Sequence, residues 1–167
     1  MPLPKTVGNA YSYRNTLRID PETPSGKLME RINLAGIHVL LVEDDDDALG
    51  ILGGYLHHLG ALVTLARNGT EAFRCLKQAR ADVIVTDLSM PGMGGIEFLS
   101  RLHDDPGEAT HPTPVIAITA FSETFGGPQL AEEAGFRACL VKPVSPIRLA
   151  TKVRQVFDHM NLPESKS

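Results

Sequence analysis

Short apolar runs rich in β-branched residues alternate along the chain with longer segments of helical periodicity. The apolar runs have the length of strands and cover residues 38–42, 61–66, 82–86, 114–119 and 139–141. The segments between them place apolar residues three or four positions apart and cover residues 46–59, 69–78, 95–103 and 128–134. A fifth helix is expected after Ser145-Pro146, because serine is a favoured helix cap and proline is favoured at the first helical position. The pattern therefore predicts five successive strand–helix units.

Such an alternation predicts an α/β fold, a doubly wound parallel sheet of five strands with helices on both faces. Strands that are apolar on both faces need this cover, and right-handed crossovers leave few arrangements. Ligands of such sheets bind at the carboxyl ends of the strands. The polar residues expected at that edge are Glu43, Asp44, Asp87, Thr119 and Lys142.

The two ends of the chain show no sustained period. Residues 1–35 mix Pro, Gly, Asn and Ser with scattered charge, and we interpret them as an N-terminal extension or linker, disordered in part. Residues 161–167 form a polar tail in this interpretation. The expected single domain covers residues 36–160, which is an ordinary size for one core.

Composition excludes some classes of partner. The formal charge of −4 and a pI near 5.8 give no general attraction to nucleic acid or to an anionic membrane, so we expect neither as a partner. The chain has two cysteines far apart in sequence, no signal segment at its start and no apolar run near eighteen residues. We expect a cytoplasmic, reduced protein.

Five consecutive carboxylates, Glu43 to Asp47, directly follow the first apolar run in the stretch HVLLVEDDDD. Two like charges about 4 Å apart repel by roughly 4 kcal/mol at an effective dielectric near 20, so a strand that ends in stacked acids needs compensation. A bound cation is the obvious source. The last three acids, Asp45, Asp46 and Asp47, are better explained as the start of a helix, because carboxylates favour its positive N-terminus.

Four motifs then carry a resemblance to a known family. They are VLLVEDD, DVIVTDLSMPGMGG, VIAITA and LVKP, and they occur in the family's order. The chain from about Ile37 to Phe157 resembles the receiver domain of the response regulators of two-component phosphorelays. The resemblance implies a flavodoxin-like (βα)5 fold with the strand order 2-1-3-4-5.

The resemblance also assigns roles to the residues at the carboxyl edge. Asp87 matches the phosphoacceptor, and Thr119 and Lys142 match the groups that contact the phosphoryl oxygens. A carboxylate that attacks phosphorus forms an aspartyl phosphate, and a hard cation such as Mg²⁺ screens the two anions from each other. The Mg²⁺ ligands that the resemblance implies are Glu43, Asp44, Asp87 and the main-chain carbonyl of Ser89.

The chain departs from the family's pattern at Cys139, at Gly94, which replaces the Asp common before Gly95, and in the segment 121–130. Cys139 stands three positions before Lys142, where the family has the aromatic residue of its conformational switch, so the usual aromatic switch is in question. The segment 121–130 carries two adjacent glycines where the fourth helix should begin, and we expect a mobile loop there.

Only 25 residues follow Lys142, too few for a DNA-binding or catalytic output domain. We therefore expect a single-domain response regulator that receives phosphate from a histidine kinase or a histidine phosphotransfer protein. It signals by protein contact, which in this family involves the face of the fourth helix, fifth strand and fifth helix. Its own Mg²⁺-dependent phosphorylation and dephosphorylation are the only reactions expected of it.

Three alternatives stay open at this point. The chain could be the receiver module of a hybrid histidine kinase, or a pseudo-receiver that binds a partner without carrying phosphate. The presence of all five edge residues argues against the pseudo-receiver. A phosphatase of the haloacid-dehalogenase type also forms an aspartyl phosphate, but it needs a second Asp two residues after its nucleophile, where this chain has Ser89.

Overall fold

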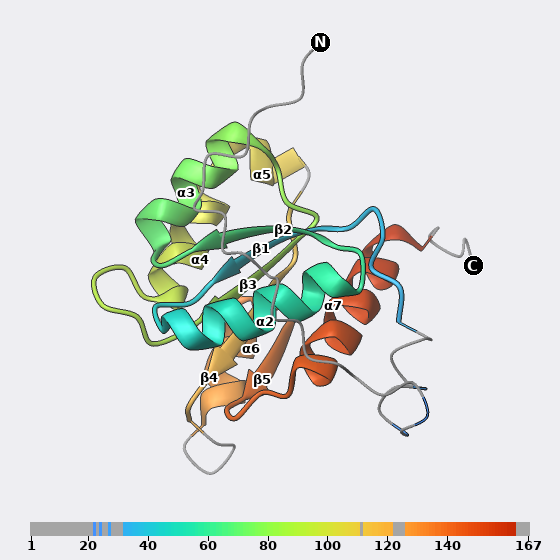
Figure 1. Ribbon diagram of the computed structural model, residues 1–167. Helices are drawn as coiled ribbons and strands as arrows, with labels where there is room; N and C mark the ends of the chain where they lie inside the picture. The colour runs from blue at the N-terminus through green and yellow to red at the C-terminus, as the bar shows by residue number, and fades with distance from the viewer. Residues whose placement is uncertain are drawn as a thin grey trace, which may run out of the picture.

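The computed structural model shows one parallel sheet between two layers of helices (Figure 1). It describes residues 32–110, 112–121 and 126–162, with residues 22, 24 and 27. Most of the predicted N-terminal extension, residues 163–167 of the predicted tail and part of the predicted mobile loop lie outside the described residues.

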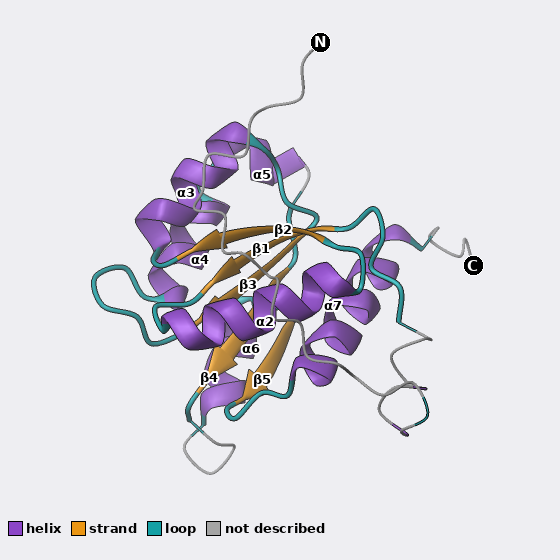
Figure 2. Ribbon diagram, in the orientation of Figure 1, coloured by secondary structure: helices purple, strands orange, loops and turns teal. Residues whose placement is uncertain are grey.

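The elements alternate as the sequence pattern predicts (Figure 2). The strands are β1 (His38–Val42), β2 (Leu62–Ala66), β3 (Val83–Asp87), β4 (Val115–Thr119) and β5 (Ala138–Val141). The helices are α2 (Asp46–His58), α3 (Gly69–Gln78), α4 (Gly95–His103), α5 (Pro106–Thr110), α6 (Gly127–Ala134) and α7 (Pro146–Asn161).

The strand order is β2-β1-β3-β4-β5, and all four pairings are parallel. This confirms the predicted flavodoxin-like order. The register pairs Val42 with Ala66 on one side and with Thr86 on the other. Thr119 pairs with Val141 at the far side of the sheet. The carboxyl ends of the strands therefore meet at one edge.

Two apolar clusters hold the layers together, one on each face of the sheet. The first joins alternate strand residues such as Val39 and Leu41 to Leu56 of α2 and Val153 of α7. The second joins the intervening strand residues to α3, α4 and α6, with Phe98 of α4 fully buried. Each buried side chain of this size contributes about 1.5–3 kcal/mol to folding. Helices on both faces explain why β3 and β4 are buried along their whole length.

The structure adds two features to the predicted pattern. The short helix α5 was not expected, and it is held by Glu108, whose carboxylate accepts hydrogen bonds from the backbone N–H and the hydroxyl of Thr113. Leu34 is completely buried in the first cluster, although the sequence pattern places it in the extension. The packed part of the chain thus begins a few residues earlier than its periodicity indicates.

Across the described ranges, every helix is too short or too polar to cross a lipid bilayer.

Candidate functional site

The five predicted edge residues converge where the strands end. Glu43 directly follows β1, Asp87 and Thr119 are the last residues of β3 and β4, and Lys142 directly follows β5. Glu43, Asp87 and Thr119 are buried to 97% or more, whereas Asp44 is exposed. Buried charged groups need partners, so the contacts of these side chains decide what the site can do.

Lys142 is the cation of the site. Its ammonium group donates a short hydrogen bond to Oδ2 of Asp87, and it lies 3.2 Å from Oε2 of Glu43. About a third of the Lys142 side chain is exposed, so the ammonium group spans the boundary between the buried carboxylates and solvent. One positive charge therefore faces two buried negative charges.

The carboxylates form a cluster that is short of positive charge. Oxygens of Glu43, Asp44 and Asp87 all lie within 4.8 Å of one another. Oε2 of Glu43 is buried and accepts no hydrogen bond, although the Lys142 ammonium lies beside it. The other oxygen of Glu43 accepts a hydrogen bond from the backbone N–H of Asp45 at 3.1 Å. An orphaned buried oxygen beside two further carboxylates fits a small hard cation such as Mg²⁺.

The electrostatics agree with this geometry. Burial raises the pKa of Glu43 above its ordinary value, and the negative charge of Asp87 raises it further, against the opposing effects of the Asp45 N–H and Lys142. Burial acts to lower the pKa of Lys142, but the hydrogen bond to Asp87 and the negative charges of Asp87 and Glu43 raise it above the ordinary value. Lys142 is therefore fully charged at neutral pH, and the charged form of Glu43 is disfavoured.

The loop after β3 fixes the second oxygen of Asp87. Oδ1 accepts a hydrogen bond from the backbone N–H of Ser89 at 2.8 Å. Gly95, at the start of α4, lets the helix approach this loop, since a Cβ there would lie 2.5 Å from the main-chain oxygen of Asp87 and 3.0 Å from Cα of Leu88. The loop and the helix therefore pack backbone to backbone. The role predicted for the main-chain carbonyl of Ser89 stays a prediction.

Thr119 lies at the end of β4 with its side chain fully buried. Its hydroxyl oxygen accepts a hydrogen bond from the backbone N–H of Phe121 at 3.0 Å, and its main-chain oxygen accepts one from the N–H of Lys142 at 2.7 Å. The second bond ties the end of β4 to the residue that carries the ammonium group. The peptide bond between Lys142 and Pro143 is cis.

The remaining acids of the run serve the helix, as expected. Asp45 caps α2, and its carboxylate accepts a hydrogen bond from the backbone N–H of Ala48 at 2.7 Å. Asp46 and Asp47 lie in the first turn, where Asp46 also pairs with Arg67 at 2.8 Å. Sequence reasoning did not identify Arg67, which follows β2 and has no motif of its own.

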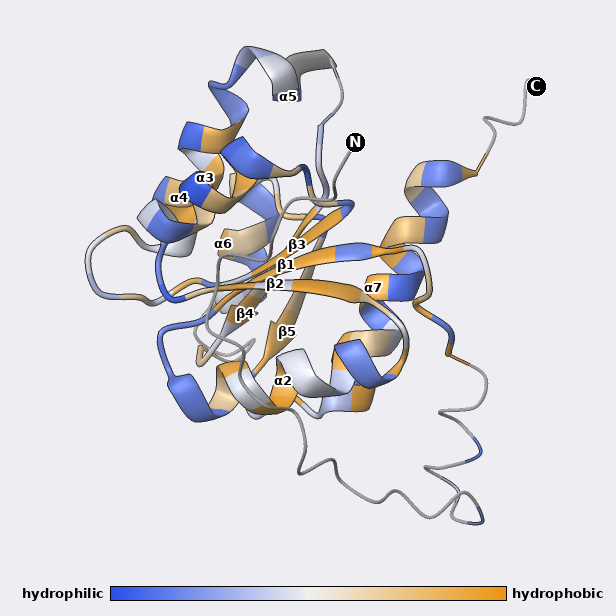
Figure 3. Cartoon of the chain, turned by 45° about the horizontal axis from the view of Figure 1, so that its top comes forward, coloured by the Kyte–Doolittle hydropathy of each residue, from blue (hydrophilic) through white to orange (hydrophobic). Residues whose placement is uncertain are grey.

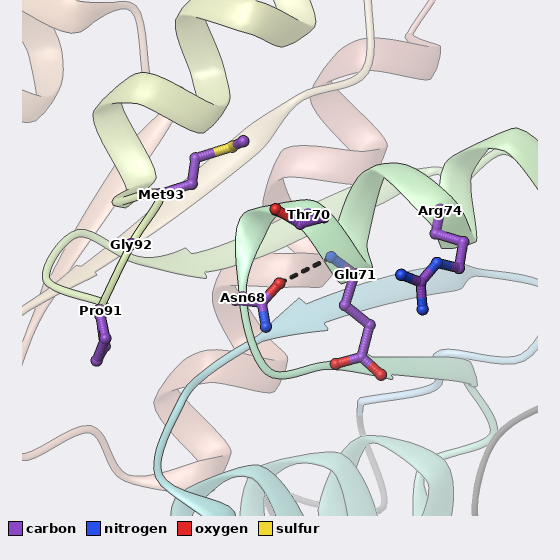
Figure 4. Close-up of a pocket in the computed structure, with 7 residues that line it drawn as sticks. All are labelled: Asn68, Thr70, Glu71, Arg74, Pro91, Gly92 and Met93. Atoms are coloured by element: carbon purple, nitrogen blue, oxygen red, sulfur yellow. Dashed lines mark hydrogen bonds between the residues drawn. The ribbon is translucent and has the colours of Figure 1, made fainter.

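A surface hollow of about 420 Å³ lies beside the site and contains none of the five edge residues (Figure 4). It separates the start of α3 from the loop after β3, where Met93 faces the helix. Asn68 caps α3 by accepting a hydrogen bond from the N–H of Glu71. A Cβ on Gly69 would lie 2.5 Å from Sδ of Met93, so the thioether anchors the loop on α3. Asn68 and Glu71 therefore serve local structure, since the Glu71 carboxylate also accepts a hydrogen bond from the N–H of Arg67.

Cys139 occupies the middle of the edge strand β5 and is partly buried among the residues of the second apolar cluster. Burial raises the pKa of its thiol above the ordinary value. Both cysteines are free. Cys139 therefore acts as a small apolar side chain where the resemblance led us to look for an aromatic ring.

Comparison with protein families matches residues 39–154 to the response regulator receiver domain. Among curated proteins, the chain is 33% identical over 135 residues to the chemotaxis protein CheY-3 of Vibrio cholerae, which covers 79% of this chain and all of the relative. It is 31% identical over 116 residues to the polar-differentiation response regulator DivK of Brucella anthropi, covering 70% of this chain and 92% of that protein.

A solved structure shares the arrangement. The receiver domain of a sensor histidine kinase from Pseudomonas aeruginosa PAO1 superposes with a TM-score of 0.65 at 27% sequence identity, covering 74% of this chain and 99% of the other. That structure has a magnesium ion coordinated in its active site cleft.

Proposed function

Because the chain belongs to the response regulator receiver domain family, we propose that Asp87 accepts a phosphoryl group from a histidine kinase or a histidine phosphotransfer protein. One observation carries the proposal: three carboxylates have oxygens within 4.8 Å of one another, the Lys142 ammonium contacts two of them, and one buried oxygen of Glu43 is left without a hydrogen bond. Such a site is incomplete as a structural ion pair and suits a cation and an incoming phosphoryl group.

In the proposed reaction, a carboxylate oxygen of Asp87 forms a bond to phosphorus while the P–N bond to the donor histidine breaks. The electron pair of that bond stays on the imidazole nitrogen. The residues that would hold Mg²⁺ are Glu43, Asp44 and Asp87 with the main-chain carbonyl of Ser89. When bound, Mg²⁺ supplies the positive charge that lets a phosphoryl anion approach the carboxylates.

Lys142 and Thr119 have the chemistry to stabilise the product. The ammonium group of Lys142 already contacts Asp87, and its raised pKa keeps it charged when phosphoryl oxygens arrive. The Thr119 hydroxyl keeps its own proton free to donate, because in the described structure it accepts from Phe121. We propose that these two groups bind the phosphoryl oxygens.

We further propose that the receiver domain occupies residues 36–160, extended at its start by Leu34, and that it acts in the cytoplasm. It signals through protein contact at the face of α6, β5 and α7, and catalyses only its own phosphorylation and dephosphorylation. A receiver module of a hybrid kinase is the second candidate, which the likeness to a sensor-kinase receiver favours. A pseudo-receiver is disfavoured by the complete set of edge residues.

Incubation with acetyl phosphate, followed by intact mass measurement, tests the proposal. We expect one added phosphoryl group that requires Mg²⁺ and that is absent from Asp87→Asn. Asp82→Asn is the matched control, since it makes the same chemical change at the opposite edge of the sheet. An adduct that persists in Asp87→Asn, or no adduct together with no binding of beryllofluoride, would overturn the proposal.

A further inference from the structure

A groove of about 320 Å³ lies between the edge strand β5 and helix α7, away from the carboxylate cluster. Figure 1 shows the two elements at one end of the sheet. Ala138, Val156 and Met160 supply apolar groups to the groove, and Arg137, Lys152 and His159 supply polar ones. Because β5 pairs only with β4 among the described strands, its outer backbone edge faces this side of the molecule.

The basic groups continue along α7 beyond the groove. Arg148, Lys152 and His159 are four and seven positions apart, so they lie on one face of the helix. Hydrophilic and hydrophobic bands alternate along α7 in Figure 3, as expected for a helix with one face on the core. We call Arg137, Arg148, Lys152 and His159 the basic face.

No acid neutralises the basic face within the described part of the chain. Asp158 is the one acid in the sequence of α7, and both of its oxygens accept hydrogen bonds from Arg154. The ion pairs formed among the described residues include none of the basic face, and Arg137 instead donates to the sulfur of Met160. A chain with a net charge of −4 thus places the positive charges of Arg137 and Lys152 at one groove, with no ion pair to an acid among the described residues.

We propose that this groove binds an acidic segment of a partner protein, with apolar side chains of that segment on Ala138 and Val156. The inference rests on the proposed function, since it names the chemistry of the partner that contacts this face. The basic face attracts such a segment, whereas the chain as a whole carries a net charge of −4, so charge sets where and in which orientation the segment docks. Residues 1–31 are an unsuitable occupant, because they carry five Lys and Arg against three Asp and Glu.

A random 12-residue peptide library, displayed and selected on the full chain, tests this inference. The enriched peptides are then measured on the variant Arg148→Glu/Lys152→Glu, which takes no part in the selection. The matched control is Arg74→Glu/Lys77→Glu, which makes the same charge change on exposed residues of α3. We expect the enriched peptides to be rich in Asp and Glu, to bind the first variant at least about tenfold more weakly than the unaltered chain, and to bind the control within about twofold.

Three results would overturn the inference. The first is a selection that enriches no peptide, or only peptides without an excess of Asp and Glu. The second is peptide binding that both double variants weaken equally. The third is a basic face that binds a DNA duplex or phosphatidylserine vesicles and no peptide. Phosphorylation by acetyl phosphate is measured on the same preparations. If the unaltered chain takes up no phosphoryl group, the proposed function fails while the peptide selection still decides the docking chemistry.

Discussion

Charged and polar side chains gather at both edges of the sheet, where the strands begin and where they end. At the beginning, both ring nitrogens of His38 have hydrogen-bond partners, the main-chain oxygen of Arg80 at 2.6 Å and the hydroxyl of Thr64 at 2.8 Å. The backbone N–H of His38 donates to Asp82 at 2.8 Å. At the carboxyl edge, Glu43 keeps a buried oxygen without a hydrogen bond.

The difference shows how to separate structural polar groups from functional ones in this fold. Polar groups that satisfy each other stabilise the folded state, and losing one costs free energy. Groups buried without full compensation cost stability themselves and persist where a ligand completes them. Substitutions at the two edges should therefore have effects of opposite sign.

The largest expected loss of stability comes from a substitution that disrupts the backbone packing beneath the carboxyl edge. Gly95→Ala places a Cβ against the main-chain oxygen of Asp87, and we expect it to lower the free energy of unfolding by about 2–3 kcal/mol, because backbone atoms cannot yield as a side chain does. Gly50→Ala is the control: its Cβ meets open space within α2. It should leave stability unchanged or raise it by up to about 1 kcal/mol. Urea unfolding measures both, and equal effects would contradict the close approach.

At the amino edge, His38→Ala should lower the free energy of unfolding by about 1–2 kcal/mol, since it removes two hydrogen bonds and leaves Thr64 without a partner for its hydroxyl. His58→Ala is the matched control, because His58 is exposed on α2. We expect it to change stability by less than about 0.5 kcal/mol. Thermal and urea unfolding give the values, and a neutral His38→Ala would remove the contrast between the edges.

In metal-free buffer, Glu43→Gln should raise the free energy of unfolding, whereas His38→Ala lowers it. Because burial raises the pKa of Glu43 above 4.5, the folded state prefers the neutral side chain. The stability that this proton contributes is present below pH 4.5 and is lost as the pH rises through the folded-state pKa. At pH 7 the neutral amide should therefore raise the free energy of unfolding by about 1 kcal/mol.

The pH profile checks that sign. In EDTA, the gain from Glu43→Gln over the unaltered chain should shrink as the pH falls toward 4.5. In Mg²⁺ the order should reverse, because the variant lacks one carboxylate ligand and gains less from the cation. A variant that is less stable than the unaltered chain under every condition would mean that Glu43 is an ordinary structural group.

Much of this comparison was accessible from the sequence, and the reasons for the exceptions are physical. The five edge residues end apolar runs, so the pattern that predicts the strands also brings these residues together. The helix α5 has only five residues and no period, so no pattern could predict it. Leu34 lies in a short stretch that mixes apolar and polar residues without a sustained period, so only its place in the first apolar cluster identifies it as core.

The basic face is a further exception of the same kind. Arg148 and Lys152 share a helix, but Arg137 precedes β5, and only the fold brings it to the same groove. The pairing of Asp158 with Arg154, by contrast, follows from their spacing of four positions on one helix. Motifs identify sites whose residues follow strands in a fixed order, whereas surface charge depends on which partners the side chains choose.

The smallest expected change of stability comes from Asp82→Asn at the amino edge, which we compare with Asp87→Asn, the same chemical change at the carboxyl edge. Asp82→Asn keeps an oxygen that accepts from the N–H of His38, so it should alter the free energy of unfolding by less than about 0.5 kcal/mol. Its thermal stabilisation by Mg²⁺ should equal that of the unaltered chain, because Asp82 lies at the edge opposite the carboxylate cluster. Asp87→Asn removes one of the three clustered carboxylates and should lose most of that stabilisation. If Mg²⁺ stabilises both variants equally, the cation binds elsewhere, and the buried oxygen of Glu43 without a hydrogen bond does not mark its site.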